Sequence, residues 1–285
     1  MLNELVSVNS KFVEIMEQQE GVLGAWYFGS VAHDTADGYS DIDIVFLADE
    51  DSFGRIDERL DSLLSEACDE IVLRWDENFN SDAIKCYGYL LRYDGKLFLY
   101  DVFLLNQGKI DDFMCRIHYT DLKPCDVIFD KNGSVQALIA KAVTGSRWHA
   151  DIRRLVTTYW FHVHMSAKYF VRQDFFKLEG ILRTLMDTHA SLLLSAYDRI
   201  TWGGSANKLH YIPAEKQEHL LLYGCVRDFA LVRENMDKSM RWFDEDVREI
   251  GNEEIRAYNA RLAEAIIPDW QEQTKFLADC CACRT

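Results

Sequence analysis

The spacing of the hydrophobic residues changes near residue 145, and this change limits the folds open to the chain more than any other feature. Before it, short apolar runs separated by turn residues predict strands. These runs are GVLGAWYFG, SDIDIVFLA, AIKCYGYLLRY, KLFLYDVFLL and CDVIFD. Asp94-Gly95 stands between the third and fourth runs and predicts a two-residue hairpin turn. With helical spacing over residues 2–19 and in SFGRIDERLDSLLSEA, residues 1–145 are expected to form an α/β (α+β) domain with a mixed sheet.

From about residue 148 the hydrophobic residues follow a period of 3.6, which is the spacing of an amphipathic helix. The apolar stripes cover about 148–170, 178–196, 216–242 and 252–265. No strand pattern of comparable quality interrupts them. Residues 146–285 are therefore expected to form an all-α helical bundle domain, with the boundary in the segment TGSRW.

Composition and charge restrict the partners of the chain. A net charge of −16 over 285 residues argues against a nucleic-acid partner, because an acidic surface repels phosphates, but it suits a cationic small substrate. The chain opens without a charged and apolar leader, and no apolar run approaches the roughly 18 residues of a membrane span. We therefore expect a cytoplasmic protein with free thiols and no membrane partner. The tail residues Cys280, Cys281 and Cys283 lack a second ligand pair at zinc spacing, and their role is left open.

Three aspartates stand in or beside the predicted strands. Because side chains alternate between the faces of a strand, Asp41 and Asp43 point the same way. Two neighbouring carboxylates repel each other unless a positive charge lies between them, and Mg²⁺ prefers such oxygen ligands. Asp101 stands alone among apolar residues in LFLYDVFL, where an unpaired charge is costly. Three acids on adjacent strands can hold one or two metal ions for displacement at phosphorus.

A glycine-serine pair precedes these acids. Gly29 lets backbone N–H groups approach a phosphate closely, and Ser30 adds a hydroxyl donor. A helix that begins at Ser30 would favour an anion at its N-terminus as well. Each signal is weak alone, since most Gly-Ser pairs are turns and most Asp-x-Asp pairs are solvated, but together and in this order they are far more specific.

The stretch FGSVAHDTADGYSDIDIVF resembles the signature of the nucleotidyltransferase superfamily that includes DNA polymerase beta. That signature is a hydrophobic residue, Gly-Ser, a gap of about ten residues and Asp-x-Asp. YDVF, around Asp101, looks like the site of the third acid. The two-domain order is similar to that of antibiotic nucleotidyltransferases of the larger lincosamide type. Three segments of the chain are also similar to this type: YSDID, LFLYDVFLLNQGKIDDF and AKYFVRQDFFKLEGILRTLMDTHASLLL.

The resemblance implies a reaction. A nucleoside triphosphate, ATP in the first instance, would bind near Gly29 and Ser30, with Mg²⁺ held by Asp41, Asp43 and Asp101. A hydroxyl of a small molecule would attack the α-phosphorus and release pyrophosphate, mostly through positioning and charge neutralisation.

The resemblance also places basic residues near Arg172 and Lys177, which we expect to bind the triphosphate. A solvated helix end is the alternative for both residues.

Several alternatives stay open at this level. In the lincosamide type, a further Glu lies several residues after the third acid and is a candidate base. The corresponding positions of this chain are Asn106 and Gln107. The candidates for the base are then Asp101, Asp111, Asp112 and Glu179. The expected acceptor is an antibiotic, either a lincosamide or an aminoglycoside. Transfer to a protein partner, as in antitoxins that adenylylate a toxin, and a non-catalytic nucleotide-binding regulatory module are the alternatives. A homodimer is left open.

Overall fold

The chain divides into two compact units, Met1–Ser146 and Arg147–Thr285, and each is described here by itself. The computed structural model describes residues 2–32, 36–37, 40–144, 151–196, 209, 211–224 and 228–281. Most of the predicted boundary segment TGSRW and the tail residue Cys283 lie outside the described residues.

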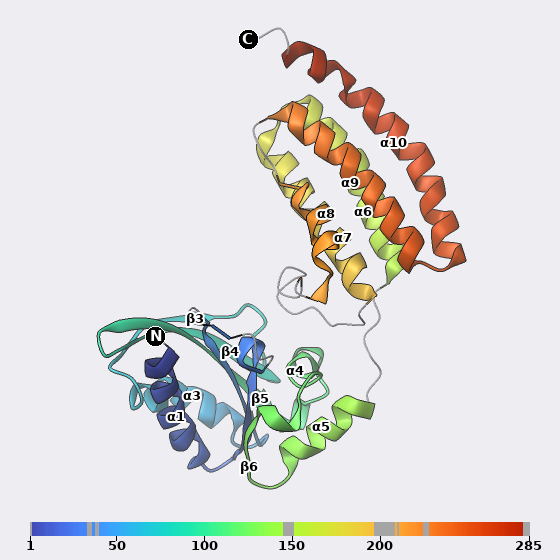
Figure 1. Ribbon diagram of the computed structural model, residues 1–285. Coiled ribbons are helices and arrows are strands. Elements are labelled where there is room, and N and C mark those ends of the chain that lie inside the picture. Colours follow the sequence, from blue (N-terminus) through green and yellow to red (C-terminus); the bar gives the residue numbers. More distant parts are fainter. Residues whose placement is uncertain are drawn as a thin grey trace. The chain divides into compact units, whose positions relative to one another are not determined.

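The first unit is a mixed six-stranded sheet with helices on both faces (Figure 1). Its elements are α1 (Leu2–Glu17), β1 (Val22–Phe28), α2 (Gly29–Ala32), β2 (Ile42–Ala48), α3 (Phe53–Ser65), β3 (Glu70–Asp76), β4 (Ile84–Tyr93), β5 (Lys96–Asn106), η1 (Gln107–Lys109), α4 (Phe113–Ile117), η2 (Pro124–Asp126), β6 (Val127–Asp130) and α5 (Ser134–Thr144). The strand order is β3-β4-β5-β2-β1-β6. Only β2 and β5 run parallel among these neighbours, which confirms the predicted mixed sheet.

The β4–β5 turn has the conformation that its sequence predicts. Asp94 has a φ of 49° and Gly95 a φ of 72°. Two successive positive φ values match the twist of a two-residue hairpin, and Asp-Gly adopts them readily. The turn sets the register that brings Gly88 of β4 opposite Asp101 of β5.

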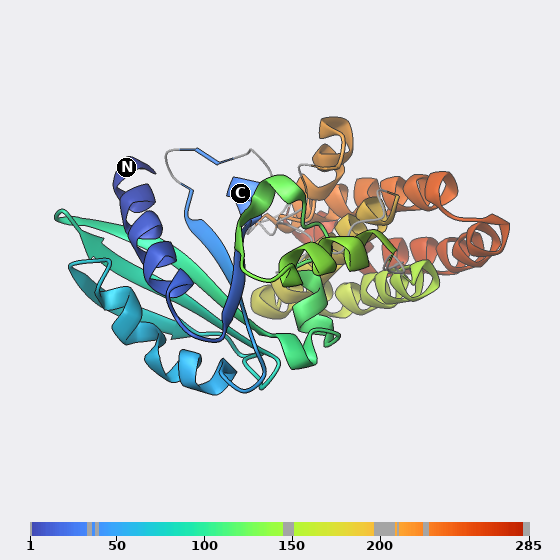
Figure 2. The same ribbon diagram turned by 90° about the horizontal axis from the view of Figure 1, so that it is seen from below.

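The two faces of the sheet have different cover. Helices α1 and α3 lie against one face, where they bury a core that includes Phe12, Phe46 and Tyr100 (Figure 2). Inside this core Asn9 of α1 donates to Tyr27 Oη and accepts from Tyr100 Oη, both at 2.8 Å. Each polar group in the layer is thus paired, as burial requires.

The opposite face is covered over β1 and β6 by α5, and over β1 and the later part of β5 by the α4 region, where His118 contacts Phe28 and Phe103. There Trp26 Nε1 donates to the carbonyl oxygen of His118, which follows α4, at 3.0 Å. Val135 of α5 approaches Gly24 of β1 so closely that a Cβ on the glycine would lie 2.3 Å from Val135 Cγ2. The part of this face over β3, β4 and the start of β5 carries exposed apolar side chains.

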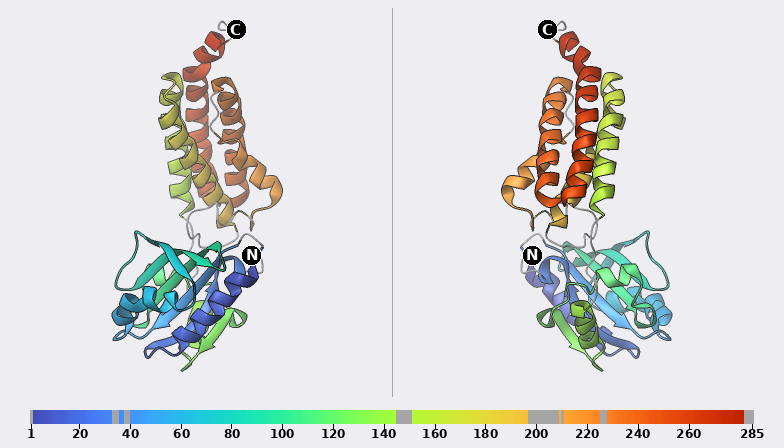
Figure 3. Two further views of the ribbon diagram at one scale, coloured as in Figure 1. Left: turned by 90° about the vertical axis from the view of Figure 1, so that its left-hand side faces the viewer. Right: turned by 90° about the vertical axis from the view of Figure 1, so that its right-hand side faces the viewer.

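The second unit is helical (Figure 3). Its helices are α6 (Ile152–Val171), α7 (Phe175–Ser195), α8 (Ala214–Leu221), α9 (Phe229–Ile250) and α10 (Glu253–Cys281). The long helices α6, α7, α9 and α10 lie side by side, as expected for a bundle. Tyr159 of α6 stacks on Phe243 of α9 with ring centroids 3.5 Å apart. Trp160 and Trp270 donate their indole N–H groups to buried oxygens of Asn259 and Ser166.

The structure departs from the sequence prediction in three places. Strand β3 and helices α4 and α5 were not expected. The helical pattern over 216–242 corresponds to two helices: α8 ends at Leu221, and α9 begins at Phe229 with Asp228 accepting hydrogen bonds at its N-cap. Helix α10 runs to Cys281, well beyond 265, and tolerates Pro268 inside it.

Candidate active site

One row of residues crosses five strands on the less covered face of the sheet. From β1 to β3 the directly paired positions are Phe28, Asp43, Asp101, Gly88 and Trp75. Cross-strand partners point to the same face, and neighbouring strands lie about 4.8 Å apart. The parallel pairing of β2 with β5 therefore places the carboxylates of Asp43 and Asp101 next to each other. Asp41 precedes β2 by one residue and shares the face of Asp43.

The three carboxylates lie within electrostatic range of one another. Burial, followed by the charges of Asp41 and Asp101, raises the pKa of Asp43 from 3.8 to about 8. Burial, followed by the charges of Asp41 and Glu77, raises the pKa of Asp101 from 3.8 to about 7. Both shifts have the same cause, because burial and like charges disfavour the ionised form. A cation between the carboxylates would remove this cost.

Gly29 lies directly against the carboxylate of Asp43. Its φ is +62°, a conformation that side chains with a Cβ rarely adopt, and a Cβ here would lie 2.1 Å from Asp43 Oδ2. The glycine thus leaves room for the carboxylate at the point where β1 ends and α2 begins. Ser30 follows it in α2. Because α2 has only four residues, it does not support the helix-dipole argument made from the sequence.

The donor set fits a hard divalent metal ion. Asp41, Asp43 and Asp101 supply carboxylate oxygens from one face, and Asp43 and Asp101 are paired neighbours. Oxygen ligands of this kind suit Mg²⁺, which retains positions for phosphate and water. The raised pKa values of Asp43 and Asp101 mark the negative potential that such an ion would neutralise.

Sequence reasoning missed two residues at this site, Gly88 and Glu77. A Cβ at Gly88 would lie 3.2 Å from Asp101 Oδ1 and 3.7 Å from the Cβ of Trp75, so the glycine leaves a gap between them. Glu77 continues β3 by one residue, and its N–H donates to the carbonyl oxygen of Cys86 at 3.2 Å. The run of Ile71, Val72 and Leu73 is typical of a strand and could have revealed β3, which Glu77 follows, but no local signal points to Gly88.

Comparison with known proteins supports nucleotide transfer. Residues 10–85 match the family model described as Nucleotidyltransferase domain. This segment runs from α1 to the start of β4 and contains Gly29, Ser30, Asp41 and Asp43. Nucleotidyltransferase domains in general use a nucleoside triphosphate and a divalent metal.

A solved structure of similar extent is titled a nucleotidyltransferase-like protein from Exiguobacterium sibiricum 255-15. It is 10% identical, with a TM-score of 0.33, over 96% of this chain and 91% of its own. No curated protein matches the chain. The resemblance to the larger lincosamide type therefore stays a prediction.

The proposed bases Asp111 and Asp112 have structural partners. Asp111 pairs with Lys141 of α5. Asp112 is the N-cap of α4 and accepts from the N–H of Met114 at 2.9 Å. Asn106, at the register of the family's further Glu, accepts from the N–H of Gly108 and donates to the carbonyl oxygen of Asp82. These contacts give Asp112 and Asn106 a role in the local fold.

The remaining predicted residues belong to the second unit. Arg172 caps the C-terminus of α6 with its backbone N–H. Lys177, in the first turn of α7, pairs with Asp174 at 3.1 Å and lies over the ring of Tyr169. Glu179 is exposed on the same helix. Their functions stay predictions, because each unit is described separately.

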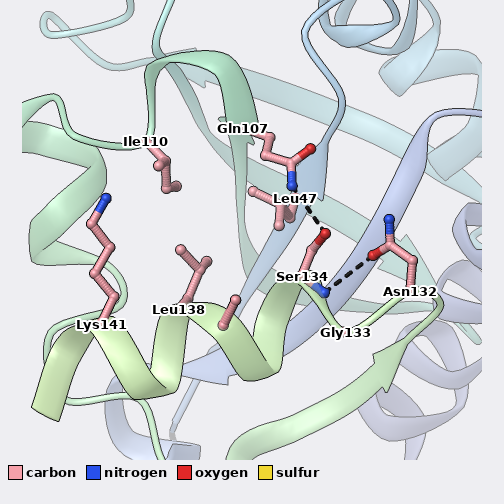
Figure 4. A pocket seen from close by; sticks show the side chains of 9 residues that line it. Leu47, Gln107, Ile110, Asn132, Gly133, Ser134, Leu138 and Lys141 are labelled. Atoms are coloured by element: carbon pink, nitrogen blue, oxygen red, sulfur yellow. Dashed lines mark hydrogen bonds between the residues drawn. The ribbon is translucent and has the colours of Figure 1, made fainter.

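A cavity of about 410 Å³ lies at the other end of the same strands (Figure 4). Its lining residues are Leu47, Gln107, Ile110, Asn132, Gly133, Ser134, Ala137, Leu138 and Lys141. Gln107 Nε2 donates to Ser134 Oγ at 2.9 Å, and Asn132 Oδ1 accepts from the N–H of Ser134. No carboxylate lines this cavity, so it is separate from the acid cluster.

A polar cluster is buried in the second unit. Asp246 accepts from His189 Nε2 at 2.7 Å, and His219 Nδ1 lies 3.1 Å from the same oxygen. The ammonium of Lys216 contacts the other carboxylate oxygen at 2.5 Å and compensates its charge. Tyr223 Oη pairs with His189 Nδ1. His189 is thus a buried histidine with a hydrogen-bond partner at each ring nitrogen. Among the described helices, none is long and apolar enough to cross a lipid bilayer.

Proposed function

We propose that this chain transfers a nucleoside monophosphate from a nucleoside triphosphate to a hydroxyl of a small molecule. The observation that carries the proposal is the paired placement of Asp43 and Asp101, with Asp41 on the same face and Gly29 against Asp43. Burying neighbouring carboxylates costs free energy, and a bound cation would offset that cost. The family match over residues 10–85 supports the same chemistry.

Asp41, Asp43 and Asp101 would hold Mg²⁺. When bound, the ion neutralises the triphosphate and the charge that develops on the reacting oxygens. Gly29 and Ser30 would lie along the phosphates, because the absent Cβ lets the main chain approach them.

The acceptor oxygen forms a bond to the α-phosphorus, and the bond from that phosphorus to the oxygen bridging to the β-phosphate breaks. Pyrophosphate leaves with the bonding electrons. If Asp101 does not hold the ion, it is our choice to accept the hydroxyl proton, because its carboxylate lies beside Asp43 and next to the open position of Gly88. Arg172 and Lys177 would contribute positive charge to triphosphate binding.

The finer assignments are ATP as donor, a lincosamide or aminoglycoside as acceptor, and a cytoplasmic role in antibiotic resistance. They rest on the resemblance of YSDID and the later segments, and on the net charge of −16, which favours a cationic acceptor.

The test combines purified protein, Mg²⁺, each of the four nucleoside triphosphates and a panel of lincosamides and aminoglycosides. We expect pyrophosphate release and a product heavier than the acceptor by one nucleoside monophosphate. Asp41→Asn and Asp43→Asn should abolish both signals, whereas Asp51→Asn, in an exposed turn, should not. If the panel yields no product although nucleotide and Mg²⁺ bind, the acceptor is another molecule. Loss of metal-dependent nucleotide binding as well would refute the proposal.

A further inference from the structure

The sheet face beside the acid cluster is apolar and exposed. Leu73 and Trp75 of β3 and Leu99 of β5 have 51%, 60% and 48% of their surface exposed. Leu90 of β4 lies between the two leucines, since it pairs with both Leu73 and Leu99. A continuous apolar surface of this kind is typical of a binding site.

The register relates this surface to the acids residue by residue. Trp75 and Asp101 are both partners of Gly88, so the indole and the carboxylate stand on either side of the glycine. Their backbones are about 10 Å apart, which is two strand spacings. Because Gly88 has no side chain, a ring lying on Trp75 can extend across β4 and bring a hydroxyl to Asp101.

Glu77 adds a negative charge at the border of the same surface. It lies two residues after Trp75 and therefore on the same face, opposite Cys86. It also raises the pKa of Asp101, which indicates that the two carboxylates lie within electrostatic range. The nearby cations of β3 and β4 are engaged elsewhere: Arg74 pairs with Asp61, and Arg92 pairs with Glu70.

We propose that Trp75, Gly88 and Glu77 form the acceptor subsite, and that it takes a cationic, hydroxyl-bearing compound with an apolar ring face. This inference rests on the proposed function, because it is the transfer reaction that requires the hydroxyl of the bound compound to point toward Asp101. Trp75 carries the ring face by stacking and by its affinity for cations. Glu77 pairs with an amine of the acceptor, and Gly88 leaves the path to Asp101 open.

A second copy of the chain is a poorer occupant of this face. A two-fold contact over it would bring the same acid-bearing patch, with Glu77 and Asp101, from both copies together. Like charges would then meet in a partly buried contact, which costs free energy. A small cation removes that repulsion.

The kinetic test separates acceptor binding from nucleotide binding. Trp75→Ala should raise KM for the acceptor about tenfold, with KM for the nucleotide unchanged, and Trp75→Phe should restore most of the loss. Glu77→Gln should raise KM for amine-bearing acceptors about tenfold and leave KM for a neutral hydroxylated acceptor within about twofold. The matched controls are Phe161→Ala, an aromatic residue of α6 that is 59% exposed, and Glu66→Gln, an exposed acid after α3. Both should behave as the natural chain.

A binding measurement distinguishes failure of this inference from failure of the proposed function. The panel compounds are titrated with Mg²⁺ and a non-reactive triphosphate analogue, and the fluorescence of the natural chain is compared with that of Trp75→Ala. A saturable, Trp75-dependent change without any transfer would support the subsite and refute the transfer reaction. Transfer with an acceptor KM that neither Trp75→Ala nor Glu77→Gln changes would overturn the subsite alone. Absence of both signals overturns the subsite, and loss of metal-dependent nucleotide binding as well overturns the proposed function too. A dimer that Trp75→Ala converts to monomer assigns the face to self-association and overturns the subsite.

Discussion

In metal-free protein, Asp43→Asn is expected to stabilise the first unit at neutral and alkaline pH while it abolishes nucleotide transfer. Burial and the charges of Asp41 and Asp101 raise the pKa of Asp43 from 3.8 to about 8. The native state therefore binds a proton that the unfolded chain releases above pH 4. Stability is then full below about pH 4, falls as the pH rises toward 8, and changes little beyond it. The uncharged amide of Asn does not incur this loss.

The magnitude follows from the size of the shift. A shift of about 4 pKa units corresponds to at most roughly 5–6 kcal/mol at about 1.4 kcal/mol for each unit. Water that enters the site reduces this cost, so we expect Asp43→Asn to raise the free energy of unfolding by about 2 kcal/mol at pH 8. For a unit of this size, that is a rise in Tm of roughly 4–8 °C.

The assay is thermal unfolding in EDTA at pH 5, 6, 7 and 8, with Asp51→Asn as the control in an exposed turn. The difference in Tm between Asp43→Asn and the natural chain should grow with pH. Adding Mg²⁺ at about 100 times its Kd should stabilise the natural chain by about 2.7 kcal/mol and leave Asp43→Asn nearly unchanged. A natural chain with the same Tm as the variant at every pH, or one indifferent to Mg²⁺, would refute the reasoning.

The remaining predictions concern the glycine beside the cluster and the buried carboxylate of the second unit. Gly29→Ala should lower the free energy of unfolding by at least about 1 kcal/mol because of the positive φ, and it should impair transfer by displacing Asp43. Gly54→Ala, where an added Cβ would meet nothing within 4 Å, should raise the free energy of unfolding by about 0.5 kcal/mol. Urea unfolding measures both changes. Asp246→Asn should lower the free energy of unfolding by about 2 kcal/mol at pH 7, because it removes the buried carboxylate that contacts His189 and leaves Lys216 paired with Glu249 alone. Burial raises the pKa of Asp246, but hydrogen bonds outweigh it and lower the pKa to about 2. The destabilisation by Asp246→Asn should therefore shrink as the pH falls from 4 toward 2. An unchanged destabilisation across that range would contradict the lowered pKa of Asp246.

Much of the first unit could be predicted from local patterns. β1, β2, β4 and β5 each put an apolar face against a core, so their hydrophobic residues reveal them. β3 escaped prediction because it is an edge strand whose residues are mostly exposed, and burial therefore leaves no alternating pattern in it. Helix α5 is short and follows the last strand, where the change of period near 145 hid it.

The sequence by itself determined that Asp41 and Asp43 share a face and that Gly29 turns the chain before them, because strand alternation and glycine conformation are local properties. It also indicated a third acid at Asp101. Only the tertiary structure decided that Asp101 lies beside Asp43, since that depends on the parallel pairing of β2 with β5 across more than fifty residues. The same long-range register placed Gly88, Trp75 and Glu77 around Asp101, and no local pattern encodes which residue of a neighbouring strand will lie opposite.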